Sequence, residues 1–458
     1  MYQINYDKPV HIHFIGIGGI SMSGLAAVLL KRGFTVSGSD ARRTPLTQWL
    51  TELGASIAYP QSADNITDDI DVAVYTAAIH PDNPEFQAAQ KKSVPMLSRA
   101  QLLGELMNNY ESSIAVAGTH GKTTTTSMLS HILMHAQLDP TISVGGILPA
   151  IGGNVRMGKS EYFLTEACEY TNSFLELSPT LGIILNIDAD HLDFFKDLED
   201  IRHSFRLFAQ KIASDGFLVI NAQIPRIEEL TKDLACRTVT FGIGCGDYQI
   251  TDLSYDDMGC GSFSLTHDGN TLGHFTLRVP GKHNVANAAA ALVSGALLGI
   301  PADVMAEGIL AFTGTDRRFQ KKGELGGVTI IDDYAHHPTE IRATLHAAKK
   351  YPCKHVWCVF QPHTYTRTKA LLDEFADALC LADRVVLADI YAARETDTLG
   401  VSSEDLREKV AARGTQAWYF STFDEIENFL LENCIPGDLL ITMGAGDVVK
   451  IGENLLGQ

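Results

Sequence analysis

The sequence has no excess of basic residues and no long apolar run. Its 458 residues include 36 lysines and arginines against 55 aspartates and glutamates, which gives a formal net charge of -19. A surface that binds nucleic acid irrespective of base sequence needs a basic stripe, so the charge argues against that class of protein. The stretch with least charge, around residues 285–300, contains two glycines and polar side chains and is too short to cross a bilayer comfortably. We therefore expect a buried helix there.

Cysteine pairs at metal-binding spacing are also missing. The eight cysteines are scattered along the chain, and no two of them form a C-x-x-C pair. Zinc binding is therefore not expected, and the pattern is typical of reduced thiols in a cytosolic protein. Residues 1–8 do not have the character of a signal peptide. We expect a cytoplasmic protein that does not insert into a membrane, while the oligomeric state stays open.

The length and the alternation of apolar runs with glycine turns predict three α/β domains. Residues 1–108 show a βαβαβ pattern, which predicts a parallel, Rossmann-like sheet. Residues 109–314 form a second α/β unit with a mixed or parallel sheet, in which short alternating runs between 238 and 279 predict a small antiparallel sheet at the edge. Residues 315–458 again alternate strands with helices, as expected of a third, Rossmann-like domain.

The most informative motif is the glycine-rich stretch 117–126 in the second unit. It follows a short apolar run and precedes a helical pattern, and it contains Gly121-Lys122-Thr123. In such a loop the backbone amides and the helix N-terminus bind phosphate, the lysine reaches the β- and γ-phosphates, and the threonine hydroxyl binds Mg²⁺. Val116 stands where the usual pattern has its first glycine. A glycine turn before an ordinary helix would give a similar pattern, but Gly-Lys-Thr in this context favours nucleotide binding.

A second glycine turn opens the first unit. Residues 16–21 read Gly-Ile-Gly-Gly-Ile-Ser, and Asp40 ends the next strand about twenty residues later. This spacing is typical of loops that bind a diphosphate, with the acid on a ribose hydroxyl, although Ser21 replaces the third glycine. A tight strand-to-helix turn without a ligand would look similar.

Polar residues follow several other predicted strands. Glu166 and His191 each come after a strand of the central unit, where open α/β sheets bind ligands, so both are candidate Mg²⁺ ligands beside Thr123. Each of them could instead be a polar loop residue.

Two further motifs lie near the predicted boundary between the second and third units. Asn284 and Asn287 fall within one turn at the start of an alanine-rich helix, where helix capping is the simpler alternative. Arg317 and Arg318 form a basic pair suited to phosphate, although elsewhere such a pair would be a solvated surface feature.

Two loops of the third unit, 332–340 and 361–368, place titratable side chains at successive strand ends. They contain Asp332, His336 and Arg367. Either loop alone could serve for helix capping, but two on consecutive strands indicate a site.

Taken in order, these motifs resemble those of one enzyme family. The set comprises Gly-Ile-Gly-Gly, Gly-Thr-His-Gly-Lys-Thr, an Asp-His after an Asn-Ile strand end, Gly-Lys-His-Asn-x-x-Asn, Asp-Arg-Arg-Phe, Asp-Tyr-Ala-His-His-Pro-Thr-Glu and Gln-Pro-His-x-Tyr-x-Arg-Thr. It is similar to the set found in the ATP-dependent Mur ligases of peptidoglycan synthesis, and it covers essentially the whole chain. Cys168 departs from the pattern, because many relatives have aspartate at this position.

The resemblance implies a three-domain ligase that uses ATP and Mg²⁺. The N-terminal domain would bind the UDP-sugar, the central domain ATP, and the C-terminal domain the incoming amino acid, with closure around the substrates. Within the family the motifs are most similar to those of the member that joins L-alanine to the lactyl carboxylate of UDP-N-acetylmuramate. ATP would phosphorylate that carboxylate, and the amine of alanine would then displace phosphate.

The resemblance also implies roles for individual residues. The predicted catalytic residues are Lys122, Arg317, Arg318, His336 and Arg367. The predicted ATP contacts are Gly118, Thr119, His120, Gly121, Lys122, Thr123, Thr124, Asn284, Asn287 and Asp332. The predicted UDP-sugar contacts are Gly16, Gly18, Gly19, Ser39 and Asp40, and the predicted metal ligands are Thr123, Glu166 and His191.

Three alternatives stay open at this point. A recycling ligase that attaches a whole tripeptide to the same UDP-sugar shares most of these motifs. A UDP-sugar sensor without catalysis would not need Lys122, Thr123 or the arginine pair. A nicotinamide oxidoreductase, suggested by the first glycine turn, would leave the phosphate loop unexplained.

Overall fold

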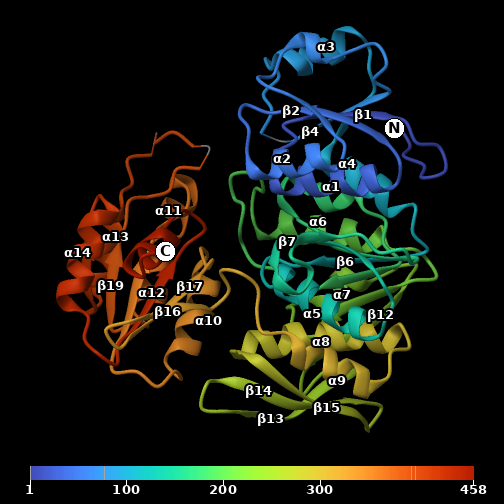
Figure 1. The fold of residues 1–458 in the computed structure, drawn as a ribbon. Helices are drawn as coiled ribbons and strands as arrows, with labels where there is room; N and C mark the ends of the chain where they lie inside the picture. Colours follow the sequence, from blue (N-terminus) through green and yellow to red (C-terminus); the bar gives the residue numbers. More distant parts are fainter. Residues whose placement is uncertain (1, 77, 394, 398) are drawn as a thin grey trace.

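The computed structural model describes residues 2–76, 78–393, 395–397 and 399–458, and these form three α/β units, each with its own sheet (Figure 1). The N-terminal and C-terminal units both lie against the central one. The three-domain α/β fold expected from the sequence is therefore confirmed. The exact domain boundaries at 108/109 and 314/315 stay a prediction. Among the helices described, none has the length and apolar character needed to span a membrane.

The N-terminal unit is a parallel sheet of five strands in the order β3-β2-β1-β4-β5. Its elements are β1 (His11–Ile15), α1 (Ile20–Lys31), β2 (Thr35–Ser39), α2 (Pro45–Glu52), β3 (Ser56–Ala58), β4 (Val72–Tyr75), α3 (Pro84–Lys91), β5 (Met96–Ser98) and α4 (Arg99–Met107). Because the strands are parallel, the loops after them gather at one edge of the sheet.

The central unit is a mixed sheet of ten strands in the order β15-β14-β13-β12-β11-β10-β6-β9-β7-β8. Its strands are β6 (Ser112–Ala117), β7 (Thr141–Leu148), β8 (Gly153–Arg156), β9 (Tyr162–Glu166), β10 (Leu181–Ile184), β11 (Phe217–Asn221), β12 (Arg237–Ile243), β13 (Tyr248–Tyr255), β14 (Cys260–His267) and β15 (Asn270–Pro280). Its helices are α5 (Lys122–His135), α6 (Leu198–Gln210), α7 (Ile227–Thr231), α8 (Lys282–Leu297) and α9 (Ala302–Ala311). The predicted antiparallel hairpins β13–β15 extend the edge of this sheet, because β13 pairs in parallel with β12.

Helix α8 is the buried helix expected near residues 285–300. It packs on α5, and four consecutive alanines, 288–291, are fully buried within it. Small side chains let the two helices approach closely. This packing brings the start of α8, with its polar residues, next to the start of α5.

The C-terminal unit is a six-stranded sheet in the order β16-β17-β21-β18-β19-β20, in which β16 alone pairs antiparallel among the strands described. Its elements are β16 (Gln320–Leu325), β17 (Val328–Asp333), α10 (Pro338–Ala348), β18 (Val356–Phe360), α11 (Tyr365–Ala370), α12 (Leu372–Leu379), β19 (Arg384–Leu387), α13 (Ser403–Ala412), β20 (Gln416–Tyr419), α14 (Phe423–Asn433), β21 (Leu439–Met443) and α15 (Val449–Leu455). Its two functional loops follow β17 and β18.

The two interfaces with the central unit differ in character. The N-terminal unit shares a continuous apolar core with it, and glycines permit close contact there. A Cβ atom on Gly104 of α4 would lie 2.1 Å from the carbonyl oxygen of Glu176, and one on Gly24 of α1 would lie 2.3 Å from Val155. The C-terminal unit makes polar contacts with the central unit, such as Arg367 with Asp190. An apolar interface favours a fixed arrangement, whereas a polar one is typical of parts that move relative to each other.

Candidate active site

The phosphate loop lies between β6 and α5, as the sequence predicts. Gly118 and Gly121 have φ angles of 145° and 85°, which residues with a side chain rarely adopt. A Cβ atom on Gly121 would also lie 2.5 Å from Oδ1 of Asn287 at the start of α8. The backbone conformation therefore requires glycine at both positions, and the packing of α8 on the loop also requires it at Gly121.

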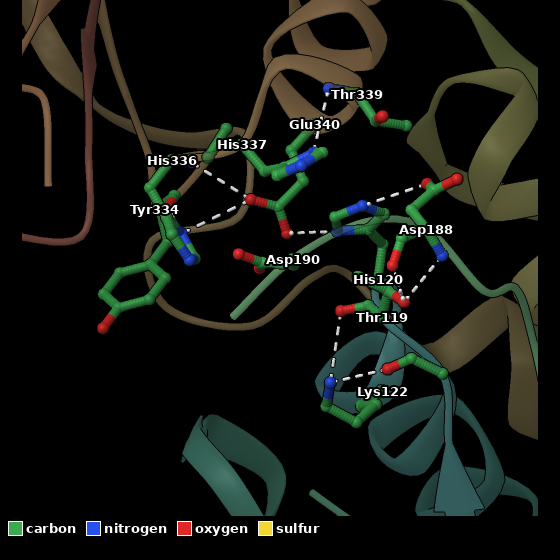
Figure 2. Close-up of polar contacts among 12 residues, drawn as sticks. Thr119, His120, Lys122, Asp188, Asp190, Tyr334, His336, His337, Thr339 and Glu340 are labelled. Atoms are coloured by element: carbon green, nitrogen blue, oxygen red, sulfur yellow. Dashed lines mark hydrogen bonds and ion pairs between the residues drawn. The ribbon is translucent and has the colours of Figure 1, made fainter. Parts of the chain in front are cut away.

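Lys122, the first residue of α5, is held by several acceptors. Its ammonium group donates to the carbonyls of Gly118 at 2.6 Å and Thr119 at 3.1 Å, and to the Glu169 carboxylate at 2.8 Å (Figure 2 shows the Thr119 contact). Burial alone would lower the pKa of Lys122, but the neighbouring Glu169 carboxylate outweighs this effect and raises it. The lysine is therefore charged at neutral pH and fixed at the mouth of the loop.

The neighbouring Thr123 and Glu166 bring oxygen ligands together. The Thr123 hydroxyl donates to Oε2 of Glu166 at 3.1 Å, and the amide of Gly145 donates to Oε1 at 2.6 Å. Burial raises the pKa of Glu166 and outweighs these hydrogen bonds and the nearby cations, as expected of a carboxylate that lacks a close counter-ion.

The third predicted metal ligand, His191, lies further along the same side. Its Nε2 atom is 3.7 Å from Glu169, and no contact joins it to Thr123 or Glu166 among the interactions of the described residues. Within that part of the chain, no group of three or more His, Cys, Asp and Glu side chains forms a complete metal site. Thr123 and Glu166 alone supply two oxygen donors, and Mg²⁺ commonly takes its remaining ligands from nucleotide phosphates and water.

His120 in the phosphate loop connects the central and C-terminal units. Its Nε2 atom is 3.2 Å from Oδ2 of Asp188, and its Nδ1 atom is 3.3 Å from Oε1 of Glu340 in α10. Burial would lower the pKa of His120, but the two carboxylates raise it to about 9. The imidazole is therefore a cation at neutral pH, placed between two acids (Figure 2).

Glu340 is the centre of this polar cluster. Besides His120, its carboxylate accepts a hydrogen bond from the amide of His336 at 3.0 Å and lies 3.7 Å from the guanidinium of Arg318. Burial alone would raise the pKa of Glu340, but the surrounding basic groups hold it well below its usual range. Figure 2 shows Glu340 between the His120 ring and the His336 loop. It thus acts as the counter-ion for both sides of the cleft.

A cavity of about 310 Å³ opens beside this cluster, between the central and C-terminal units. Asn284 and Asn287 line it from α8, and Nδ2 of Asn287 donates to Oδ1 of Asn284 at 3.2 Å. Its other lining residues include His120, Gly121, Thr124, Asn186, Phe241, His283, Arg318, Asp333 and Glu340. The phosphate loop thus faces a pocket with apolar and amide walls.

The structure separates the arginine pair. Arg317 binds Asp332 at 2.8 Å and the carbonyls of Gly444 and Gly446 at 2.8 and 3.0 Å, so its guanidinium is engaged within the C-terminal unit. Asp332 is fully buried and does not line the cavity. Arg318, the residue after Arg317, and Asp333, the residue after Asp332, do line the cavity. The geometry therefore favours Arg318 over Arg317 for a phosphate contact, and it gives no support to the predicted contact of Asp332 with ATP.

A larger cavity, of about 830 Å³, lies where the three units meet. Arg367 lines it from the C-terminal unit and binds Asp190 at 3.0 Å, while its other terminal nitrogen lies 3.2 Å from Nδ1 of His363. Burial would raise the pKa of Asp190, but Arg367 and nearby histidines hold it far below its usual value. Arg367 is thus fixed by a charged contact that crosses between units.

His336 lies in the loop before α10, next to Glu340 and the ring of His363. Its Nδ1 atom is 2.9 Å from the carbonyl of Tyr334, so Nδ1 carries the proton and Nε2 holds a lone pair. Burial lowers the pKa of His336 to about 4, against the raising effect of Glu340. The ring is therefore neutral at pH 7 and can accept a hydrogen bond.

The predicted UDP-sugar residues gather at one edge of the N-terminal sheet. The amide of Gly18 donates to Oδ2 of Asp40 at 2.8 Å, which shapes the glycine turn. Ser39 is fully buried and donates to Glu85, so its side chain supports the turn from below. A Cβ atom on Gly16 would lie 3.5 Å from Thr76, which lines the larger cavity.

Several residues at the site were not predicted, namely Glu169, Asp188, Asp190 and Glu340. All four lie inside motifs that the sequence singled out, within three residues of a predicted ligand or motif histidine. The sequence could not predict which basic side chain each of these acids contacts, because most of those partners are distant in the chain. Acidity next to a predicted cationic loop is the signal that could have identified them.

Comparison with known proteins gives a consistent result. Three family models match successive parts of the chain: the Mur ligase family catalytic domain over residues 11–111, the Mur ligase middle domain over 116–295, and the Mur ligase glutamate ligase domain over 317–446. A UDP-N-acetylmuramate–L-alanine ligase of Lachnospira eligens is 58% identical over 458 residues, with 100% of both chains covered.

Two solved structures also resemble the chain over nearly its full length. A UDP-N-acetylmuramate-alanine ligase of Thermotoga maritima is 31% identical, with a TM-score of 0.81 and 98% of each chain covered. A murein peptide ligase of Psychrobacter arcticus is 25% identical over the same share of both chains, with a TM-score of 0.72.

Proposed function

Because this chain belongs to the Mur ligase family, we propose that it joins L-alanine to the lactyl carboxylate of UDP-N-acetylmuramate, with ATP as the energy source, in peptidoglycan precursor synthesis. The observation that carries the proposal is the identity of 58% over the full length with a ligase of that name. Scattered free thiols agree with a cytoplasmic location for this reaction.

ATP is proposed to bind with its phosphates on the loop 118–124 and its base in the smaller cavity. The amide groups of Asn284 and Asn287 line that cavity and offer hydrogen-bond donors and acceptors to a base. Thr123 and Glu166 would hold Mg²⁺, which neutralises phosphate charge when bound. His191 is retained as a further candidate ligand, because it lies across Glu169 from Lys122.

In the first step a lactyl carboxylate oxygen attacks the γ-phosphorus of ATP, and the bond to the bridging oxygen of ADP breaks. Both reactants are anionic, so the step needs fixed cations that require no rearrangement during the reaction. Lys122 is one such cation, fixed by three backbone and side-chain acceptors. Arg318 is the second, since it lines the cavity beside the loop.

In the second step the amine of L-alanine attacks the carbonyl carbon of the acyl phosphate, and phosphate leaves. Arg367 is proposed to bind the carboxylate of alanine, because it lines the larger cavity and is fixed in place by Asp190. The neutral His336 is proposed to accept a hydrogen bond from the amine through Nε2, which helps to orient its lone pair.

The UDP-sugar is proposed to bind across the N-terminal unit. Its diphosphate would lie on the glycine turn of Gly16, Gly18 and Gly19, with the carboxylate of Asp40 and the buried Ser39 supporting that turn. The muramyl group would then extend into the larger cavity, which reaches all three units. This arrangement would bring the lactyl carboxylate to the phosphate loop.

The recycling ligase that takes a tripeptide is the main alternative. Among the solved structures, the L-alanine ligase of Thermotoga maritima is 31% identical with a TM-score of 0.81, whereas the murein peptide ligase of Psychrobacter arcticus is 25% identical with a TM-score of 0.72. The relative with 58% identity over the full length is also named for L-alanine. This difference favours alanine as the amine substrate.

A phosphate-release assay tests the proposal. Purified protein with ATP and Mg²⁺ should release phosphate when both UDP-N-acetylmuramate and L-alanine are present, and not when either is omitted. Turnover with the tripeptide alone would identify the recycling enzyme instead. The absence of turnover with every amine would contradict a ligase function.

A further inference from the structure

Arg99 is a cation without a partner in the wall of the larger cavity. It is the first residue of α4, directly after β5. In the part of the chain that the structure describes, no hydrogen bond or ion pair engages its guanidinium. Three other arginines near the two cavities are paired: Arg317 with Asp332, Arg318 with Glu340, and Arg367 with Asp190. Arg278, which lines the smaller cavity, is exposed to solvent.

Leaving this group unpaired is unfavourable for the folded protein. Burial lowers the pKa of Arg99, and the nearby Cys168 opposes this effect only in part. A guanidinium presents five donors that cannot lose their charge at physiological pH, so burying it without an anion costs free energy. When an unpaired charged side chain faces a cavity, a bound ligand commonly supplies the missing counter-ion.

The position of Arg99 identifies which ligand group could complete it. Ser98, the residue before it, pairs with Tyr75 in the parallel register of β5 and β4, so Arg99 lies beside Thr76. Thr76 in turn adjoins Gly16 of the glycine turn. Cys168, which follows Glu166 by two residues, lines the same cavity as Arg99. Burial raises the pKa of the Cys168 thiol, and the charges of Lys122 and Arg99 both oppose this rise, so both cations lie near it. Arg99 therefore lies between the two anion-binding loops of the molecule.

We propose that Arg99 binds the lactyl carboxylate of UDP-N-acetylmuramate and orients it toward the γ-phosphate of ATP. The inference rests on the function proposed above and adds a residue to it. A planar guanidinium can hold both carboxylate oxygens in one plane, which fixes the direction of the attacking lone pair. Arg99 stays protonated throughout: a carboxylate oxygen forms the bond to the γ-phosphorus, and the electrons of the broken bond go to ADP.

The test compares two nucleotide sugars. UDP-N-acetylglucosamine has the same UDP group as UDP-N-acetylmuramate but lacks the lactyl carboxylate. For Arg99→Gln we expect binding of UDP-N-acetylmuramate to weaken by about 10- to 100-fold, the usual loss for a charge-assisted contact, while binding of UDP-N-acetylglucosamine is unchanged. Calorimetric titration of the full chain measures both. Arg99→Lys should recover part of the loss.

A matched control is Arg237→Gln, which removes the same charge from an exposed arginine of β12 that lines neither cavity. It should bind both sugars like the wild type. Because Arg99 has no partner, Arg99→Gln should unfold at the same temperature as the wild type or at a higher one, whereas a structural arginine would lower it.

The other outcomes are distinct. Equal weakening for both sugars would overturn the carboxylate assignment and place Arg99 at the diphosphate. Unchanged binding of both, with unchanged turnover, would overturn any role for Arg99 with the substrate. If the wild type turns over no amine at all, the proposed function fails, whatever Arg99 does.

Discussion

Lys122 and Glu169 illustrate at the scale of single residues how this site keeps a charge in place. The lysine is half-buried, yet two backbone carbonyls and one carboxylate keep it protonated and oriented. Such preorganisation means that little rearrangement is needed when phosphate charge develops. His120 of the same loop contacts an acid on each side of the cleft, Asp188 and Glu340.

The first prediction concerns Lys122 itself. In Lys122→Ala the fixed cation at the γ-phosphate is lost, so we expect turnover to fall by at least about 100- to 1,000-fold. Binding of UDP-N-acetylmuramate should be largely unchanged, because the UDP-sugar is proposed to bind the N-terminal unit. Phosphate release and calorimetry measure the two effects. Equal loss of both would contradict the division of roles between units.

The second prediction uses the pH dependence of His120. Its pKa is raised to about 9 in the folded protein, so folding binds this proton more tightly than the unfolded chain does. The stabilisation is therefore fully present below the unfolded pKa of about 6.5 and is lost as the pH rises through about 9. It amounts to no more than about 3 kcal/mol by this linkage.

Thermal unfolding of His120→Asn and the wild type from pH 6 to pH 10 checks this. The gap between their unfolding temperatures should be largest at the acidic end and should close near the alkaline end. His203→Asn, at an exposed histidine of α6, is the control and should follow the wild type throughout. A gap that is constant with pH would show that the charge of His120 is not the cause.

The residues that the sequence predicted well are those that act within one local motif. Gly121, Lys122 and Thr123 could be predicted because backbone conformation, helix start and phosphate chemistry all depend on neighbours in the chain. Glu340 and Asp190 could not, because their partners lie in another unit, 220 and 177 residues away in the cases of His120 and Arg367. The arginine pair shows the same limit, since only packing decides that Arg318 faces the cavity.

At the scale of secondary-structure elements, close packing fixes the N-terminal unit on the central one. Helix α4 lies so near residue 176 that no side chain fits at Gly104. The contact sets the position of β5 and of the loop that carries Arg99. The elements proposed to bind substrate are thus positioned by glycines that line neither cavity.

The third prediction follows from this contact. Gly104→Ala should destabilise the protein by about 1–3 kcal/mol, because the new methyl group meets a backbone carbonyl that cannot move freely. The loss should appear although alanine favours a helix by about 1 kcal/mol over glycine. Gly153→Ala on β8, where a Cβ atom meets nothing within 4 Å, is the control. Denaturant unfolding measures both, and a Gly104→Ala protein as stable as the wild type would contradict the packing argument.

Most elements could be predicted because hydrophobic periodicity and glycine turns define them locally. The βαβαβ run of the first unit and the buried helix α8 are confirmed. The sequence predicted the antiparallel strands at an edge of the central sheet, but it could not predict that β13 pairs with β12, because strand pairing depends on which edges are free in the folded sheet. The antiparallel strands therefore extend the central sheet.

At the scale of the whole molecule, the three units converge on two cavities, and each unit contributes one kind of contact. The central unit lines the smaller cavity with the phosphate loop, the N-terminal unit lines the larger one with Arg99, and the C-terminal unit provides Arg318 and Arg367. The polar contacts of the C-terminal unit with the central one suit a part that opens to admit substrates and closes for reaction.

The fourth prediction tests the polar interface. In Asp190→Asn the carboxylate that fixes Arg367 is lost, so the C-terminal unit should close less completely on the central one. We expect lower turnover and a higher KM for L-alanine, since Arg367 is proposed to bind its carboxylate, with little change for UDP-N-acetylmuramate. Steady-state kinetics with each substrate varied in turn measures this. A rise in KM for the UDP-sugar alone would contradict it.

The central claim is that this protein activates the lactyl carboxylate by phosphorylation before alanine attacks. Isotope transfer tests it most directly. When UDP-N-acetylmuramate with both carboxylate oxygens as ¹⁸O reacts with ATP and L-alanine, mass spectrometry should find one ¹⁸O in the released phosphate and one in the new amide. Phosphate without ¹⁸O, formed together with the amide product, would contradict the account.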